Sequence, residues 1–344
     1  MLSTRLRTSD FEYELPSKLI AQRPAEHRDQ SRLLILERRT GTIEHGLFSD
    51  IAAELREPDV LVANRSKVIP ARIAAKKATG GEVELLLVRP LSESVWVSMA
   101  KPGRRLSPGM KLSIPDSTLE AELDEQLPSG MWTVHFTGSG DIGTQIRAAG
   151  RVPLPPYITD PDAPLDRYQT VYGDRDGSVA APTAGLHFSE SLLESIRNCG
   201  VDVRFLTLHV GPGTFQPVKT EQVEDHVLHP EWGELTAGTA DAINAARERG
   251  GRVIAIGTTT TRLLEFAFHG DAVRPFVGET SLFIYPGYRF RAVDVLVTNF
   301  HLPRSTLLML VCAFAERDLV LHAYREAVRL EYRFYSFGDA MLIL

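Results

Sequence analysis

The sequence predicts a two-domain α/β protein, in which a barrel-like large α/β domain is interrupted by a small inserted all-β barrel. Its 344 residues are too many for one simple hydrophobic core, which favours two domains. Both ends of the chain alternate apolar strand-like runs with helical patterns, whereas the middle holds short alternating runs separated by Gly/Pro turns. We therefore expect an α/β domain from residues 1–64 and 149–344, and an inserted β-barrel over residues 65–148.

Composition places the chain among ordinary globular proteins and narrows its compartment. Only two cysteines occur, Cys199 and Cys312, which excludes a disulfide framework and a Cys-rich zinc site and fits a reducing, cytoplasmic compartment. Residues 1–10 are polar and basic and do not have the pattern of a secretory signal. The longest apolar run, residues 307–315, is too short to span a bilayer.

Two apolar runs near the start of the chain, residues 33–36 and 59–64, predict buried strands. The second run ends at Asn64, and ligands bind at the carboxyl ends of strands in α/β sheets. Arg28 and Asp29 lie just before the first strand. For these two, a surface ion pair is the common alternative to a functional role.

The predicted barrel rests on short alternating runs at residues 83–88, 95–99, 111–114 and 131–136, with no helical stripe of useful length. Its charge is uneven. Residues 65–112 contain ten Lys/Arg against three Glu, a balance of +7, whereas the remainder to residue 150 carries −5. A basic face on a chain of net charge −6 is expected for a polyanion partner, and a solvated face without function is the alternative.

Residues 178–188 (SVAAPTAGLHF) form a small, nearly uncharged stretch around which we expect the site to be organised. Its proline fixes one backbone angle and Gly185 permits a positive φ, so it predicts a shaped loop that delivers His187. Ser189 or Ser191 then caps a helix, and N–H groups at a helix N-terminus stabilise a carboxylate or phosphate. The alternative is a tight structural turn with a buried, hydrogen-bonded histidine.

Two later apolar runs, residues 201–210 and 251–257, predict strands that lead into glycine turns. The first places His209 before a glycine loop at residues 211–213. The second runs through Gly257 into a threonine cluster and a helix, an arrangement that can cradle an anionic group. Neither a Walker A loop nor a Gly-x-Gly-x-x-Gly fingerprint occurs.

The tail of the chain predicts two more strands, at residues 280–286 and 293–298. The second ends in Asn299 and His301, which again places polar groups at a strand end. Asp339 lies beside a glycine, and the alternative to a functional role is that it only forms a turn. Further helices are expected at residues 240–249, 258–265, 307–315 and 319–330.

One cluster has the composition of a metal site. His226, His229 and Glu231 are closely spaced, but no helix or further ligand pattern supports metal binding there. We therefore expect no metal.

Read together, these segments resemble the S-adenosylmethionine:tRNA ribosyltransferase-isomerase family of the queuosine pathway. The matching segments are RDQSRLLIL (28–36), DVLVANRSKVIPARI (59–73), GRVPLPPYI (150–158), YQTVYGDRDGSVAAPTAGLHF (168–188), TLHVGPGTF (207–215), GRVIAIGTTTTRLLE (251–265), FIYPGYRFRAVDVLVTNFHLPRSTLLMLV (283–311) and YRFYSFGDAML (332–342). They cover both ends of the chain in the expected order.

The resemblance implies transfer of the ribosyl unit of S-adenosylmethionine, rather than its methyl group. The acceptor is the aminomethyl group of 7-aminomethyl-7-deazaguanine at the tRNA wobble position. Adenine and methionine leave, and the sugar rearranges to the epoxycyclopentanediol of epoxyqueuosine. The amine must be neutral to attack, a base must remove the proton that the sulfonium acidifies, and an acid helps adenine to leave.

Imidazoles, a carboxylate and amide donors suit this chemistry, and they define the expected site. The expected catalytic residues are His187, His209, His301 and Asp339. The expected contacts of S-adenosylmethionine, the co-substrate, are Thr183, Gly185, Gly257, Thr258, Thr259, Arg262 and Asn299. The expected tRNA contacts are Lys67, Arg72, Lys101, Arg104 and Arg105. Which residue is base and which is acid stays open, and we expect a cytoplasmic monomer.

Arg262 is expected to form a bidentate ion pair with the methionine carboxylate, with a structural pair to Glu265 as the alternative. Two other functions were weighed for the whole chain. An RNA-binding module without chemistry rests only on the basic insertion, and release of free adenine distinguishes it from the enzyme. An ordinary methyltransferase is disfavoured because its glycine loop and acidic ribose-binding residue are missing at the expected spacing.

Overall fold

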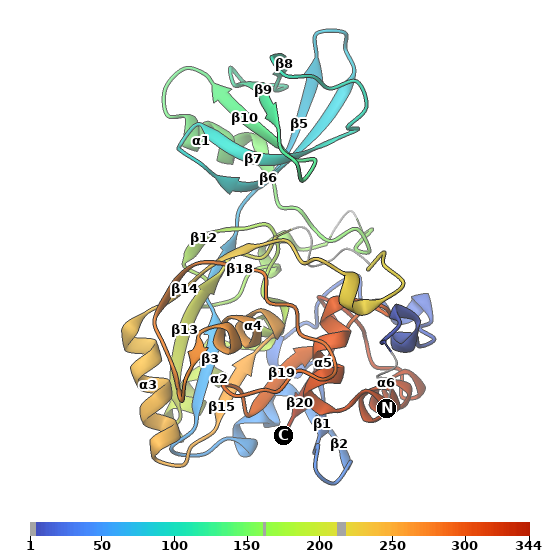
Figure 1. Ribbon diagram of the computed structural model, residues 1–344, viewed down its shortest axis with the longest axis vertical. Helices are drawn as coiled ribbons and strands as arrows, with labels where there is room; N and C mark the ends of the chain where they lie inside the picture. Colours follow the sequence, from blue (N-terminus) through green and yellow to red (C-terminus); the bar gives the residue numbers. More distant parts are fainter. Residues whose placement is uncertain (1–4, 161–162, 212–217) are drawn as a thin grey trace. The chain divides into compact units, whose positions relative to one another are not determined.

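The computed structural model describes residues 5–160, 163–211 and 218–344 (Figure 1). The chain separates into two compact units. The large domain comprises residues 1–66, 156–174 and 181–344, and the inserted domain comprises residues 67–155 and 175–180. Residues 175–180 therefore belong with the insertion and not with the large domain to which their sequence assigned them.

The inserted domain is an antiparallel β-barrel of six strands. In order around the barrel, these are β5 (Arg72–Lys77), β6 (Glu82–Pro90), β7 (Val95–Lys101), β10 (Trp132–Thr137), β9 (Glu120–Gln126) and β8 (Met110–Ser113). Pairing of β8 with β5 closes the barrel, and the short β11 (Gly150–Arg151) adds to β5. Alternate residues along β6 point inward, since Val83, Leu85 and Leu87 are buried.

The expectation that the insertion contains no helix was wrong. Helix α1 (Ile142–Ala149) follows the last barrel strand, and the Asp141 side chain accepts a hydrogen bond from Thr144 N at its start. Ile142 and Ile146 pack against the barrel core from one face of the helix. A cap followed by apolar residues four apart is a helix signal, although the helix is too short to stand out from the surrounding strand pattern.

The large domain is built on one nine-stranded mixed sheet, so the predicted α/β class with an inserted barrel is confirmed (Figure 1). The strand order is β18 (Phe276–Thr280), β14 (Glu231–Leu235), β13 (Asp202–Leu208), β3 (Val60–Asn64), β15 (Val253–Ile256), β19 (Val295–Asn299), β20 (Ala340–Ile343), β1 (Arg32–Leu36) and β2 (Ile43–Leu47). The strand expected at residues 280–286 was wrong, because the pairing with β14 ends at Thr280.

Four neighbouring strands of this sheet run parallel, namely β13, β3, β15 and β19. Strands β3, β15 and β19 are buried throughout, which explains their mainly apolar sequences, whereas the first four residues of β13 are half-buried. Because they are parallel, their carboxyl ends meet at one edge of the sheet. Asn64, His209, Gly257 and Asn299 lie at or directly after these ends.

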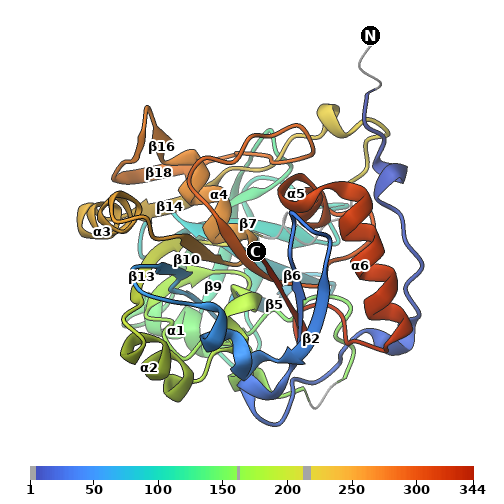
Figure 2. The same cartoon turned by 90° about the horizontal axis from the view of Figure 1, so that it is seen from below.

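The predicted large-domain helices are confirmed with small shifts of their ends. They are α2 (Glu190–Asn198), α3 (Ala237–Glu248), α4 (Thr258–Phe266), α5 (Thr306–Ala315) and α6 (Arg317–Arg329). Of the two candidate caps of α2, Ser189 is the one that accepts a hydrogen bond from Leu192 N. Helix α5 packs against α6 (red in Figure 2) and is apolar on most sides, in keeping with its burial.

Short elements complete the chain. The remaining strands are β4 (Ser66–Val68), β12 (Arg175–Ser178), β16 (Phe268–His269) and β17 (Ala272–Val273). The described 3₁₀ helices are η1 (Thr8–Phe11), η2 (Ser17–Leu19), η3 (Arg28–Gln30), η4 (Phe48–Glu54), η5 (Leu165–Arg167), η6 (Thr183–His187) and η8 (Val223–Asp225). Across the described residues, no helix combines the length and the apolar composition needed to cross a membrane.

A buried ion pair joins the amino ends of two central strands. Asp59 precedes β3 and is 1% exposed, and its carboxylate contacts the Arg252 guanidinium at 2.6 Å. The same carboxylate accepts hydrogen bonds from the backbone N–H groups of Arg56 and Arg252. Burial alone raises the pKa of this carboxyl, but the hydrogen bonds and charge of Arg252 outweigh burial and lower it.

We predict that Asp59→Asn lowers the free energy of unfolding at pH 7 by about 2–3 kcal/mol, because Arg252 loses its counter-charge. The contribution of the Asp59 charge is complete above the pKa of an unfolded aspartate, about 3.9, and is lost as the pH falls through the lower folded value. Urea unfolding at pH 7 and at pH 3 measures both effects. The more exposed pair Asp202–Arg204 provides the control, since Asp202→Asn is expected to change stability by less than about 0.5 kcal/mol. An Asp59→Asn variant as stable as this control at pH 7 would contradict the prediction.

Candidate active site

A cleft of about 660 Å³, part of it open to solvent, lies at the carboxyl edge of the parallel strands of the large domain. Its walls come from the ends of β15 and β19, the start of α4 and helix η6. The lining residues are Tyr157, Ala181, Pro182, Thr183, Ala184, Val210, Gly257, Thr258, Thr259, Thr298, Asn299, Phe300, His301, Leu302, Ser305, Leu307, Tyr335 and Ser336.

The cleft collects about half of the residues that the sequence singled out. Those that line it are Thr183, Gly257, Thr258, Thr259, Asn299 and His301. Those that do not are Gly185, His187, His209, Arg262 and Asp339. The second group divides into residues that support the cleft and residues whose polar groups are engaged elsewhere.

The predicted turn from strand to glycine to helix is present at α4. Gly257 has φ +87°, a conformation that favours glycine, and it directly precedes the helix. The hydroxyl groups of Thr260 and Thr261 bond back to the carbonyls of Ile256 and Gly257. Thr258 and Thr259, which line the cleft, are therefore the threonines available to a ligand at this helix N-terminus.

The stretch around Gly185 forms the 3₁₀ helix η6, and not a loop with a positive φ at the glycine as predicted. Gly185 is required for a different reason. A Cβ added to it would lie 2.0 Å from the hydroxyl oxygen of Tyr172 and 2.9 Å from Thr170 Cγ2. The glycine thus lets η6 pack closely on residues 170–172, which fixes the wall of the cleft.

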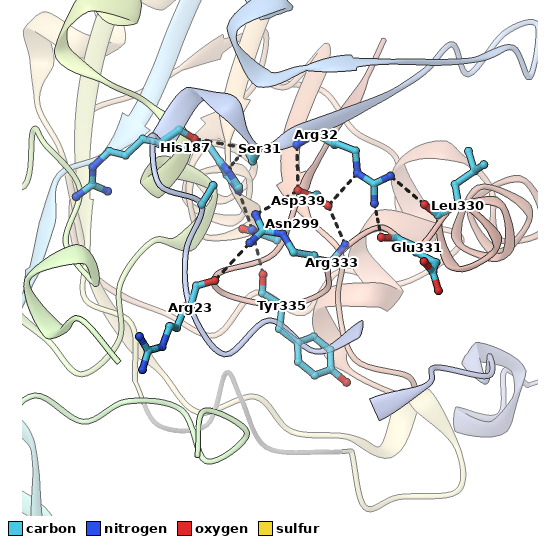
Figure 3. Close-up of polar contacts among 12 residues, drawn as sticks. Arg23, Ser31, Arg32, His187, Asn299, Leu330, Glu331, Arg333, Tyr335 and Asp339 are labelled. Atoms are coloured by element: carbon cyan, nitrogen blue, oxygen red, sulfur yellow. Dashed lines mark hydrogen bonds and ion pairs between the residues drawn. The ribbon is translucent and has the colours of Figure 1, made fainter. Parts of the chain in front are cut away.

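His187, at the end of η6, is buried and engaged at both ring nitrogens (Figure 3). Nδ1 lies 2.6 Å from Ser31 Oγ, and Nε2 lies 3.0 Å from Asn299 Nδ2. The ring stacks on Phe48 with centroids 4.9 Å apart. Burial lowers the pKa of His187 to about 4, so the imidazole is neutral at physiological pH.

Asn299 ends β19 and is 2% exposed. Its Nδ2 donates to His187 Nε2 and to the backbone carbonyl of Tyr335 at 3.3 Å (Figure 3). Both N–H bonds of the amide are then used, which fixes the amide orientation. Oδ1 is buried in the cleft wall and has no hydrogen-bond partner among the described residues. A buried acceptor of this kind suits a ligand that donates a hydrogen bond.

His301 is the imidazole that reaches the cleft itself. Its Nε2 lies 2.7 Å from Thr298 Oγ1, and its backbone is held by Tyr324, whose hydroxyl accepts from His301 N. Nδ1 makes no hydrogen bond to the residues that the structure describes. Burial lowers the pKa of His301 to about 3, so this ring too is neutral at physiological pH.

Asp339 holds the two ends of the chain together (Figure 3). Oδ1 accepts from Arg32 N at 3.0 Å, and Oδ2 accepts from Arg333 N at 2.8 Å. The guanidinium groups of the same two arginines each lie 3.5 Å from the carboxylate. With both oxygens engaged and 2% exposure, this carboxylate has a structural position, in contrast to its expected catalytic role.

His209 lies beside the cleft, where its ring stacks on Trp232 with centroids 5.1 Å apart. Its neighbour Val210 lines the cleft, whereas His209 does not. The glycine loop expected after it lies mostly outside the described residues, since residues 212–217 are not described.

Arg262 does not face the cleft. Its guanidinium is 4% exposed and pairs with Glu231 at 2.5 Å, while its Nε donates to the carbonyl of Leu282. Glu265, the alternative partner, instead accepts backbone N–H groups of residues 291–293. The alternative pair with Glu265 was therefore wrong, because the partner comes from the distant strand β14, which helix spacing cannot indicate. The expected ion pair with the methionine carboxylate stays a prediction.

Several supporting residues were missed. Ser31 holds His187, and the Tyr335 carbonyl holds Asn299. Tyr157 and Ser336 line the cleft and share a 2.5 Å hydrogen bond. Ser31 could have been found from its position, because it directly follows Arg28-Asp29-Gln30 in a segment shared with the family. Within the described part of the chain, no cluster of three or more His, Cys, Asp or Glu side chains could hold a metal ion.

The predicted tRNA contacts lie in the inserted domain. Lys67, Lys101, Arg104 and Arg105 are exposed, whereas Arg72 is half-buried and lies 3.7 Å from Glu84. A groove on the barrel brings together the basic side chains of Arg72, Lys76, Lys101 and Arg151, with Glu82 and Glu84 beside them. Arg151 was missed because the predicted boundary placed it in the other domain.

Comparison with known proteins shows the family of the chain and agrees with its fold. The chain matches the family described as "Queuosine biosynthesis protein" over residues 8–343, and it belongs to this family. Two similar relatives are S-adenosylmethionine:tRNA ribosyltransferase-isomerases. The one from Thermotoga petrophila is 51% identical over 98% of this chain and 100% of its own length, and the one from Moorella thermoacetica is 50% identical over the same shares. A crystal structure of S-adenosylmethionine tRNA ribosyltransferase from Thermotoga maritima matches 98% of this chain and 100% of its own, with 40% identity and a TM-score of 0.57.

The buried Arg262–Glu231 pair yields a prediction that separates structure from binding. Arg262→Met leaves Glu231 buried without a counter-charge and is expected to cost about 3–5 kcal/mol of unfolding free energy. Adding Glu231→Gln is expected to restore most of that loss. Urea unfolding of both variants measures this, with Arg329→Met, which breaks the more exposed pair to Glu326, as the control. A stable Arg262→Met variant with lost S-adenosylmethionine affinity would show instead that the guanidinium binds the co-substrate.

Proposed function

We propose that this chain transfers and isomerises the ribosyl moiety of S-adenosylmethionine onto 7-aminomethyl-7-deazaguanine at the wobble position of tRNA, giving epoxyqueuosine and releasing adenine and methionine. Family membership and relatives of about 50% identity with this activity support the reaction. The cleft of the large domain is the proposed site for the co-substrate. The groups described here all come from one chain, so the proposal needs only one copy.

The observation that carries this assignment is the unpartnered Asn299 Oδ1 in the cleft wall. We propose that it accepts a hydrogen bond from the 6-amino group of adenine. A buried amide oxygen without a partner is costly in the free protein, and a ligand N–H removes that cost. An analogue that lacks the amino group leaves the oxygen unpaired again, so this contact also provides specificity.

The N-terminus of α4 is the proposed site for the methionine carboxylate. Here the N–H groups of Thr258 and Thr259 and the positive end of the helix dipole favour a negative group. This replaces the role first expected of Arg262, whose charge is already neutralised by Glu231.

His187 is proposed as a positioning residue. As a neutral imidazole that accepts from Asn299 Nδ2, it holds the amide so that Oδ1 points to the ligand. The matching Nδ1–H tautomer is satisfied by Ser31 Oγ. The sequence analysis gave a buried, hydrogen-bonded histidine as the alternative to a catalytic one. The proposed role agrees with that alternative, because the histidine acts by positioning Asn299.

His301 is the proposed proton acceptor. Its ring lies in the cleft, is neutral at physiological pH, and has Nδ1 free of hydrogen bonds to the described residues. The ribose carbon next to the sulfonium must lose a proton before the sugar rearranges, and adenine must gain one as it leaves. A neutral imidazole that accepts the first proton can return it to adenine and so serve both needs.

The inserted domain is proposed to bind the tRNA backbone through its exposed Lys and Arg side chains. Lys101 and Arg151 in the barrel groove and the exposed Arg104 and Arg105 present positive charge and form no ion pair with a described residue. Phosphate contacts of this kind supply affinity that is sensitive to salt and independent of base sequence.

The adenine contact is tested with the wild-type chain and two stable ligands. We predict that S-adenosylhomocysteine binds about 10–100 times more tightly than S-inosylhomocysteine, in which a carbonyl replaces the amino group. Asn299→Leu is expected to bind both weakly and without discrimination, whereas Asn198→Leu, an exposed asparagine at the end of α2, keeps the wild-type preference. Calorimetry measures the six affinities. Equal binding of both ligands by the wild type would place the amino group elsewhere.

The tRNA contact is tested by reversing charge on the barrel. Lys101→Glu, Arg104→Glu and Arg105→Glu together are expected to weaken tRNA binding and to lower the slope of log affinity against log salt by about one for each lost phosphate contact. S-adenosylhomocysteine affinity stays unchanged as the control. Unchanged tRNA affinity would locate the RNA on another surface.

Release of labelled adenine from S-adenosylmethionine in the presence of precursor tRNA separates the enzyme from an RNA-binding module without chemistry.

A further inference from the structure

We propose that Arg28 and Arg167 of the large domain form an oxyanion-binding site next to the cleft, and that it takes a phosphate group of the bound tRNA. The identity of the anion rests on the proposed function. The site itself rests on the two arginines and the small pocket that they flank.

The pocket has a volume of about 270 Å³, part of it open to solvent. Arg28, Ser31, Arg167, His187 and Ser336 contribute side chains to its wall. It adjoins the cleft, because Ser336 lines both cavities and because His187 is bonded to Asn299 in the cleft wall. A group bound in this pocket therefore lies within one residue layer of the reacting ligand.

The two guanidinium groups are half-buried and donate to backbone carbonyls. Arg28 Nη1 donates to the carbonyl of Leu186, and Arg167 donates through Nη1 and Nη2 to the carbonyls of Glu26 and Ala25. Neither arginine forms an ion pair with a described residue. Arg167 Nε is buried and has no hydrogen-bond partner among the described residues.

The neighbouring acid does not neutralise Arg28. Asp29 instead accepts a hydrogen bond from Ser189 at 2.5 Å, so the surface ion pair that their adjacency suggested is not formed. Burial lowers the pKa of Arg28, and the positive charge of Arg167 lowers it further, with a larger effect than the opposing charge of Asp166. Two like charges that repel each other next to a cavity gain stability when an anion enters between them.

A phosphate is the anion that the surroundings favour. In the proposed function, the methionine carboxylate already has a place at the N-terminus of α4, so the anions left over are the phosphates that flank the wobble nucleotide. That nucleotide must enter the adjoining cleft for its aminomethyl group to react. Paired arginines bind phosphate through several directed N–H bonds, which would also fix the position of the nucleotide.

The test compares Arg28→Gln and Arg167→Gln with Arg39→Gln, which alters an exposed arginine on the same domain. Affinity for precursor tRNA is measured over a series of salt concentrations, and affinity for S-adenosylhomocysteine and 5′-methylthioadenosine by calorimetry. We expect each site variant to lose about tenfold in tRNA affinity and about one unit of the salt slope, with both nucleoside affinities unchanged. Arg28→Lys, which keeps the charge, is expected to retain part of the tRNA affinity.

Loss of S-adenosylhomocysteine affinity with unchanged 5′-methylthioadenosine affinity would support the oxyanion site and identify its anion as the amino-acid carboxylate. Folded variants that change neither affinity would overturn the proposal. Inorganic phosphate gives a readout that needs no reaction: it should raise the melting temperature of the wild type and of Arg39→Gln more than that of Arg28→Gln. This difference in melting temperature is expected even if the wild type releases no adenine. The oxyanion site and the proposed function can therefore be disproved independently of each other.

Discussion

The hydrogen bond from Asn299 Nδ2 to His187 Nε2 connects the two halves of the proposed site. Asn299 comes from the end of a central strand, and His187 comes from η6, whose close packing depends on Gly185. The bond requires a neutral imidazole, and burial of His187 provides one by lowering its pKa to about 4. Tyr335 accepts the other N–H of the amide, so the orientation of the amide is fixed and its oxygen lies buried in the cleft wall. The geometry of the cleft is thus set before any ligand binds, which is the condition for selective binding.

Buried charge in the large domain follows a consistent pattern around this site. The carboxylates of Asp59, Glu231, Glu265 and Asp339 are each satisfied by arginines or backbone N–H groups. They hold strands and chain ends together and have no capacity left for a ligand. Among the described residues, Asn299 Oδ1 in the cleft wall and Arg167 Nε next to the cleft are buried without a hydrogen-bond partner. Their positions at these two cavities make them candidates for contact with a ligand.

The sequence predicted those features that depend on local chemistry. Apolar runs indicated the central strands, and Gly257 followed by threonines indicated the turn into α4, because both signals lie within a few residues. Partners that come from distant elements were not predictable in this way. Arg262 and Asp339 have the charge of site residues, but β14 and the amino end of β1 engage them. Gly185 is required for the close approach of the Tyr172 hydroxyl and not for a backbone angle, and this distant contact is not visible in the sequence. The short helix α1 escaped because eight residues give too weak a periodic signal.

The central claim is that S-adenosylmethionine binds in the cleft between α4, η6 and the end of β19. The most direct measurement is a crystal structure of the chain soaked with S-adenosylhomocysteine, a stable relative of the co-substrate. The account predicts electron density for the adenine amino group within hydrogen-bond distance of Asn299 Oδ1, and for the carboxylate at the N–H groups of Thr258 and Thr259. Density for the ligand at another place, with Asn299 Oδ1 still unpaired, would contradict it.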